Sequence, residues 1–139
     1  MNQESLIDWN ERFLTGIPSI DAQHRALVNI INTLQVALSF GDARPILGGL
    51  FSHLQEYIES HFAYEANLLQ NNAYPQTAEH LAEHYRFTAG VAALIEQYHQ
   101  DPSVELAQKT KAHLLDWLVN HVLESDFAYA PFLKSCGVA

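Results

Sequence analysis

Apolar residues recur along the chain at alternating intervals of three and four positions. The pattern runs through residues 17–38, 47–68, 80–98 and 106–121. Residues three and four apart lie on one face of an α-helix, so each stretch predicts a helix with one apolar face. Alternation at every second position, which would indicate a strand, does not compete in these stretches.

Short polar segments separate the four stretches. Gly41 closes the first, Asn71 and Asn72 close the second, and Asp101-Pro102 closes the third. These residue types end helices and start turns. Helices joined by connections of a few residues pack as antiparallel neighbours. The sequence therefore predicts an all-α fold, an up-down-up-down antiparallel four-helix bundle.

The chain is long enough for one domain of ordinary size, which we expect to span residues 1–139. Within it, residues 17–124 are expected to form the bundle. Residues 1–16 then form an N-terminal arm, and residues 125–139 form a C-terminal segment with a short helix from Phe127 to Leu133.

Two local predictions concern the start of the bundle. The apolar residues of the arm, Ile7, Trp9 and Phe13, are expected to pack over one end of it. Ser19 or Asp21 is a candidate cap for the first helix, because short polar side chains accept hydrogen bonds from free N–H groups there.

The charge balance narrows the classes of partner. Sixteen acidic residues against seven basic ones give a net charge of −9, with no Lys/Arg cluster for phosphates or lipid headgroups. We expect no nucleic acid partner and no membrane insertion, since no stretch reaches spanning length. The polar residues 1–10 do not resemble a signal peptide, which favours a cytoplasmic protein. Cys136 is the lone cysteine, so an intrachain disulfide or thiolate metal cluster is excluded. No spare apolar face is evident, so a monomer is expected.

Histidine is the unusual component, because five of the eight histidines fall inside the apolar faces. They are His24, His61, His80, His84 and His121, and Glu65 lies one turn beyond His61 on the same face. One such histidine alone is most often an ordinary core or rim residue. Five of them with a carboxylate would cost about 1–3 kcal/mol for each unpaired polar group. A metal supplies the missing partner, so the set predicts a polynuclear metal site.

The residue types also narrow the choice of metal. More than four protein ligands exceed what one tetrahedral zinc ion accepts, and no thiolates are available for an iron–sulfur cluster. Imidazole mixed with carboxylate suits two octahedral first-row ions, of which iron is the leading choice. Ferritin-like di-iron bundles use four carboxylates and two histidines, whereas here histidine predominates.

Several motifs carry a resemblance to a known family. They are Ile-Asp-Ala-Gln-His at 20–24, His-Phe-Ala-Tyr-Glu at 61–65, Tyr-Pro at 74–75, His-Leu-Ala-Glu-His at 80–84, Trp-Leu-Val-Asn-His at 117–121, and Asp126. Their order and spacing, from Trp9 to Leu133, resemble the hemerythrin family and within it the bacterial single-domain branch, the bacteriohemerythrins. Myohemerythrin, a member of this family, is a known example of the bundle topology.

The resemblance implies a ligand set for two iron ions (Fe2+/Fe3+). His80, His84 and His121 would bind one iron and His24 and His61 the other. Glu65 and Asp126 would bridge the pair together with an oxo or hydroxo group. Two octahedral ions then have about one coordination position left, on the iron with two histidines. In the family, dioxygen binds there.

Reversible binding requires an apolar pocket that excludes water and proton donors. The positions that match the family's pocket are Leu27, Phe62, Trp117, Leu118 and Val122. Each of these taken alone also suits ordinary core packing.

Asp126 is the ligand that a regular helix would not predict. Five residues beyond His121 it would point about 140° away, so it can bind only if the helix ends or bulges near Ser125. Glu124, at the favourable spacing of three, is the alternative. The family pattern selects Asp126.

The remaining histidines are not expected to be ligands. His53 and His113 lie off the ligand faces, and surface positions suit them better than an outer shell. His99 ends the third helix, where a cation is favoured. Glu79 and Glu83 are most simply solvated, although either could orient a neighbouring ligand histidine.

The function that follows from the resemblance is reversible binding of dioxygen for storage, delivery or sensing, with an oxygen-consuming protein as a recipient. We expect an oxygen-binding protein rather than an enzyme, with at most weak peroxidase or oxidase side activity. One alternative is a di-iron enzyme that reduces peroxide or nitric oxide. Another is iron handling, for which a buried, nearly saturated site is poorly suited.

Overall fold

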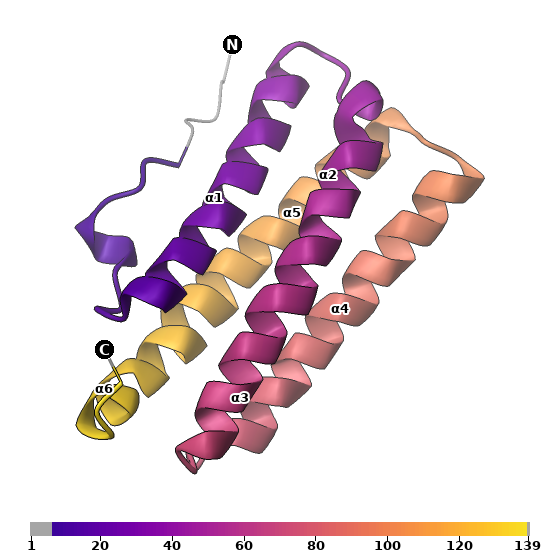
Figure 1. Ribbon diagram of the computed structural model, residues 1–139. Coiled ribbons are helices and arrows are strands. Elements are labelled where there is room, and N and C mark those ends of the chain that lie inside the picture. The colour runs from indigo at the N-terminus through magenta and orange to yellow at the C-terminus, as the bar shows by residue number, and fades with distance from the viewer. Residues whose placement is uncertain (1–6, 139) are drawn as a thin grey trace.

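The computed structural model describes residues 7–138, and every regular element in this part of the chain is a helix (Figure 1). The first helix of the bundle is α1 (Pro18–Ser39) and the third is α4 (Thr77–Gln100). Gly41, just beyond α1, has a φ of 97°, the left-handed conformation expected of a glycine after a helix. The all-α four-helix bundle is confirmed.

The second and fourth helices of the bundle each contain a π-helical stretch. The second consists of α2 (Arg44–Tyr57), the π-helical η2 (Ile58–Phe62) and α3 (Ala63–Asn71). The fourth consists of α5 (Val104–Trp117) and the π-helical η3 (Leu118–Asp126). A π-helix closes hydrogen bonds from i to i+5, so each turn holds one residue more than an α-helical turn.

The C-terminal segment begins inside the fourth helix. η3 continues past residue 124, where the bundle was predicted to end, and passes directly into α6 (Phe127–Ser135). The residues of α6 include those of the predicted short helix. In Figure 1 this helix lies at the end of the bundle where α1 begins.

The arm lies along α1. A short 3-10 helix, η1 (Glu11–Phe13), is its one regular turn among residues 7–16. Ile7 donates its N–H to Oδ1 of Asn32 and accepts from Nδ2 of Asn32, both at 2.8 Å. Trp9 and Phe13 stack with ring centroids 5.1 Å apart and pack against the core with Ile7. The arm therefore contacts the core along the flank of a helix, and the prediction that it covers one end of the bundle is wrong. Residues 1–6 of the predicted arm lie outside the described residues.

The predicted cap of the first helix is also wrong. α1 begins at Pro18, whose fixed φ suits a first helical turn, and no side chain caps it. The Ser19 hydroxyl is hydrogen-bonded to the Tyr64 hydroxyl at 2.6 Å. Oδ1 of Asp21 accepts from the backbone N–H and the hydroxyl of Thr15 at 2.8 and 2.7 Å. Asp21 therefore holds the loop that leads into α1.

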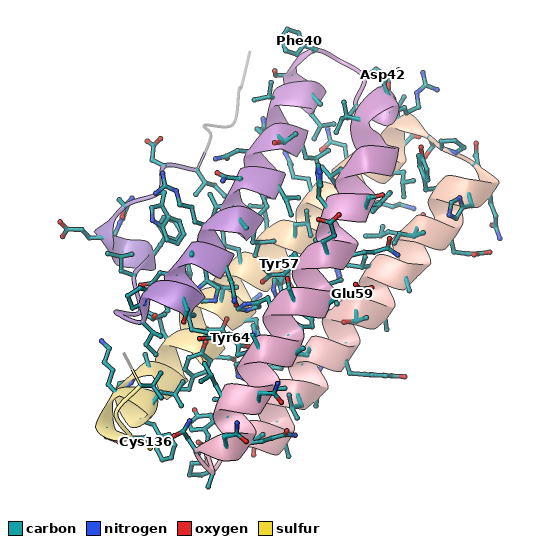
Figure 2. All side chains as sticks on the ribbon, in the orientation of Figure 1. Phe40, Asp42, Tyr57, Glu59, Tyr64 and Cys136 are labelled. Carbon is teal, nitrogen blue, oxygen red and sulfur yellow. The ribbon has the colours of Figure 1, made fainter. Side chains whose placement is uncertain are left out.

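Two apolar clusters fill the bundle and leave a polar layer between them. Ile17, just before α1, and Ile20 on α1 belong to the smaller cluster. Leu27 on α1 belongs to the larger one, and His24 lies between Ile20 and Leu27 along the helix. On the outer surface, Glu59 is an exposed polar side chain, and Phe40 is an exposed apolar one beside the connection from α1 to α2 (Figure 2). Within residues 7–138, no helix has both the length and the apolar character that crossing a membrane requires.

Candidate metal centre

The seven predicted ligands meet in the polar layer, and each is at most 5% exposed. They come from all four helices of the bundle. Their ligand atoms form two groups, and within each group these atoms lie no more than 4.8 Å apart. One group contains Glu65, His80, His84, His121 and Asp126, and the other contains His24, His61, Glu65 and Asp126. We call these the three-histidine group and the two-histidine group.

The two carboxylates belong to both groups. Glu65 directs Oε1 at Nε2 of His80 and His84, at 2.6 and 2.7 Å, and Oε2 at Nε2 of His61, at 3.2 Å. Each oxygen of Glu65 therefore faces a different group. This is the geometry that a carboxylate bridging two cations requires.

Asp126 divides its oxygens in the same way. Oδ1 lies 2.9 Å from Nε2 of His80 and 3.0 Å from Nε2 of His121, while Oδ2 lies 2.7 Å from Nε2 of His24. The two groups coincide with the ligand sets that the resemblance implies. That they bind metal remains a prediction.

The π-helical stretch η3 explains how Asp126 reaches the site. Because i and i+5 are paired in a π-helix, Asp126 lies one turn beyond His121 and on its face. Asp126 is fully buried, whereas Glu124 is exposed to solvent. The bulge that the sequence required is thus present, and it extends over residues 118–126.

Several buried atoms in this layer fit a cation better than they fit one another. Among the described residues, Nε2 of His61, Nε2 of His121 and Oδ1 of Asp126 are buried and have no hydrogen-bond partner. Nε2 of His121 and Oδ1 of Asp126 are only 3.0 Å apart, yet they are not aligned for a hydrogen bond. Buried polar atoms almost always have partners, and imidazole with carboxylate is a suitable donor set for first-row ions. The residues present fit a pair of such ions.

The electrostatics of the metal-free layer also indicate a site for positive charge. Burial lowers the pKa of His61 and His80, but Glu65 and Asp126 outweigh it and raise both values to about 9. His121 is raised to about 10 against the same effect of burial. Burial raises the pKa of both carboxyls, yet the neighbouring histidines hold both values well below the usual range. The layer is thus built for two negative carboxylates opposed by several positive charges.

The sequence matches a known family over most of its length. The family described as the hemerythrin HHE cation binding domain aligns with residues 15–133. The chain belongs to the hemerythrin family. Members of this family bind oxygen, and the resemblance seen in the motifs is confirmed.

Individual hemerythrins align with nearly the whole chain. The bacteriohemerythrin of Stenotrophomonas maltophilia is 35% identical over 94% of this chain and 84% of its own length. That of Methylococcus capsulatus is 30% identical over 94% of this chain and 99% of its own. A solved crystal structure of a hemerythrin mutant superposes with a TM-score of 0.81 at 28% identity, covering 94% of this chain and 98% of that one.

Next to the predicted hemerythrin ligands are polar side chains that sequence reasoning missed or left open. Gln23 Oε1 accepts a hydrogen bond from Nδ1 of His61, and the Tyr129 hydroxyl donates to Oε2 of Glu65 at 2.6 Å. Neither was predicted. Tyr129 follows Asp126 by three residues, and that spacing could have indicated it. Glu83, considered in the sequence as solvated or orienting, accepts from Nδ1 of His121 at 2.6 Å.

The five predicted residues of the hemerythrin oxygen pocket all belong to the larger apolar cluster. The Phe62 ring stacks on His84 at a centroid distance of 3.9 Å and lies 5.9 Å from His61. The Trp117 ring stacks on His121 at 3.7 Å. The closest of these ring contacts are therefore with the three-histidine group, and Phe62 extends the wall toward the two-histidine group.

The other three histidines lie outside both groups. His53 and His99 are exposed. His113 is partly buried, stacks on Phe87 at 4.9 Å, and donates from Nε2 to the Phe87 carbonyl at 3.2 Å. The surface position expected of His53 is present, whereas His113 packs between helices and is not a surface residue. That the three do not bind metal stays a prediction.

Proposed function

We propose that this hemerythrin holds two iron ions in the polar layer and binds dioxygen reversibly. The observation that carries the proposal is the division of both buried carboxylates, each with one oxygen toward the three-histidine group and one toward the two-histidine group. When bound, the iron pair supplies the electrons that hold dioxygen. Storage, delivery and sensing all begin with this step.

The proposed ligand assignment follows the two groups. Nε2 atoms of His80, His84 and His121 hold one iron, and His24 and His61 hold the other. Glu65 and Asp126 would bridge the pair, since each directs one oxygen toward each group. The position with two histidines has fewer protein ligands, so we place the oxygen-binding position there.

The apolar residues around the layer would keep bound oxygen from being lost as peroxide. These residues are at most 9% exposed and are Leu27, Phe62, Trp117, Leu118 and Val122. An apolar wall excludes water and the protons that it delivers. Such a wall, together with ligands buried on all four helices, favours a carrier of oxygen over an enzyme or an iron-handling protein.

Exposure of anaerobically reduced, iron-loaded protein to air tests the proposal. We expect about two irons per chain and a visible charge-transfer band that forms with oxygen and disappears under vacuum through repeated cycles. His61→Ala should abolish the band. His53→Ala, which removes an exposed histidine from the same helix of the bundle, should leave it unchanged. A single irreversible oxidation with release of peroxide would contradict reversible binding.

A further inference from the structure

The two histidine groups are supported from outside by residues in matching places. Gln23 directly precedes His24 on α1 and reaches His61 on the neighbouring helix. Glu83 directly precedes His84 on α4 and reaches His121. In both cases a side-chain oxygen accepts the Nδ1–H of a predicted ligand, and so fixes the tautomer that leaves Nε2 free for a cation.

The two supporting residues differ by one charge. Gln23 is a neutral amide, and Glu83 is a carboxylate whose Oε1 also accepts from the Ser125 hydroxyl at 2.8 Å. Ser125 lies in η3, so the π-helical stretch that turns Asp126 inward also brings a second donor to Glu83. The hydroxyl holds the carboxylate in place, where it accepts the Nδ1–H of His121, a side chain that is 2% exposed.

We propose that Glu83 and Gln23 are positioning residues that make the two metal positions electronically unequal. This inference rests on the proposed di-iron function. A carboxylate that accepts the Nδ1–H makes an imidazole a more basic ligand, and its negative charge favours the more highly charged ion nearby. Glu83 therefore stabilises the oxidised state at the three-histidine position. The neutral amide of Gln23 gives the two-histidine position no such bias.

Partial exposure limits the size of the effect. The Glu83 side chain is 29% exposed, so solvent screens part of its charge. We expect Glu83→Gln, which keeps an acceptor oxygen but removes the charge, to retain two irons and to shift the oxidised-to-reduced ratio at fixed potential three- to tenfold toward the reduced form. A tenfold shift equals 59 mV for one electron. Gln23→Glu should shift the ratio in the opposite direction.

Potentiometry of the iron-loaded variants tests the charge, and two further variants separate charge from geometry. Glu83→Ala removes the acceptor altogether and should weaken metal binding about 10- to 100-fold. Glu79→Gln makes the same change of charge one turn away on α4, on an exposed side chain, and should leave the potential unchanged. If Glu83→Gln left the potential as unchanged as Glu79→Gln does, the proposal would be wrong.

A readout without iron keeps the inference distinct from the proposed function. In zinc-loaded protein, the slowly exchanging Nδ1–H proton of His121 should be visible by NMR in the unmodified chain and in Glu83→Gln, and should exchange rapidly in Glu83→Ala. Equal exchange in all three would overturn the positioning role of Glu83 even if two irons bound. Failure of the unmodified chain to bind iron would instead count against the proposed function.

Discussion

Glu65 and Asp126 are the residues on which the geometry of the site depends most. Each is fully buried, and each faces both histidine groups. The Tyr129 hydroxyl donates to Oε2 of Glu65, and burial raises the pKa of Tyr129, which favours the protonated hydroxyl that this hydrogen bond requires. The bridging orientation is thus fixed by the protein before a cation binds.

Removal of the Asp126 carboxylate should abolish binding of the metal pair. Asp126→Ala deletes one oxygen from each group, so we expect the iron content to fall from about two per chain to below one, as measured by elemental analysis after gel filtration. Glu124→Ala removes an exposed acid two positions away and serves as the control. Loss of iron from the Glu124 variant with retention in the Asp126 variant would reverse the assignment.

A cavity in the apolar wall should shorten the lifetime of the oxygenated protein. Leu118 is 3% exposed, and Leu118→Ala opens space for water beside the ligands. We expect faster autoxidation, measured as a faster decay of the visible band in air. Leu34→Ala makes the same truncation about 15 Å along α1 from His24 and serves as the control.

Both leucine variants should lose about 2–5 kcal/mol of unfolding free energy, since both open a cavity in the core. The Leu118 variant alone should oxidise faster. An unchanged lifetime in that variant would argue against a water-excluding role for this side chain.

At the scale of the helices, the π-helical stretches decide which side chains enter the site. η2 contains His61 and η3 contains His121 and Asp126, so three of the seven predicted ligands lie in π-helix. Such wider turns are rare in proteins and are frequently found at functional sites. Here the extra residue in each turn allows His121 and Asp126 to share a face.

The contact between α4 and α5 depends on a glycine. A Cβ at Gly90 would come within 2.4 Å of Cε1 of His113, a ring held by its stack on Phe87. A Cβ at Gly49, on α2, would meet nothing within 4 Å. Gly49 therefore provides the control for a substitution at Gly90.

We expect Gly90→Ala to lower the free energy of unfolding by up to about 2 kcal/mol, because overpacking costs about 1–3 kcal/mol and helix propensity returns about 1 kcal/mol. Gly49→Ala should raise it by about 0.4–1 kcal/mol. Urea denaturation of the metal-free proteins measures both. Equal effects at the two positions would show that His113 is not held against α4.

For the whole molecule, the polar layer is a source of stability only while its charges are matched. In the metal-free protein, the protonated forms of His61, His80 and His121 oppose the two carboxylates of the layer and, at His121, the carboxylate of Glu83. Cations require the neutral imidazoles, so metal binding must displace these protons. Metal and protons therefore compete for the same layer.

This competition predicts opposite pH dependences for stability and for metal affinity. The pKa values of His61, His80 and His121 are raised from about 6.5 in the unfolded chain to about 9, 9 and 10. Their stabilisation of the metal-free protein is complete below pH about 6.5 and is lost as pH rises through about 9 to 10. Affinity for Zn2+ should rise from pH 7 to 9, with protons released on binding.

Calorimetry in buffers of different ionisation enthalpy measures the released protons, and urea denaturation measures the stability. A zinc affinity that did not change over this range would mean that the three histidines are already neutral at pH 7.

The sequence by itself determined the bundle and the inward placement of the histidines. The intervals of three and four put His24, His61, His80, His84 and His121 on the apolar faces, and that requires only the periodicity of a helix. The motifs were specific enough to indicate the hemerythrin family, which the comparison over residues 15–133 confirms. Local backbone geometry and residue type were sufficient for both conclusions.

The tertiary structure alone decided how the side chains meet. Whether residues 118–126 form α- or π-helix depends on packing against the rest of the bundle, and this places Asp126 inside and Glu124 outside. The hydrogen bonds from His61 to Gln23 and from His121 to Glu83 join helices far apart in the sequence, and they depend on how each helix is rotated about its axis. Rotation and register are set by the fit of many side chains at once, which one helix's periodicity does not encode.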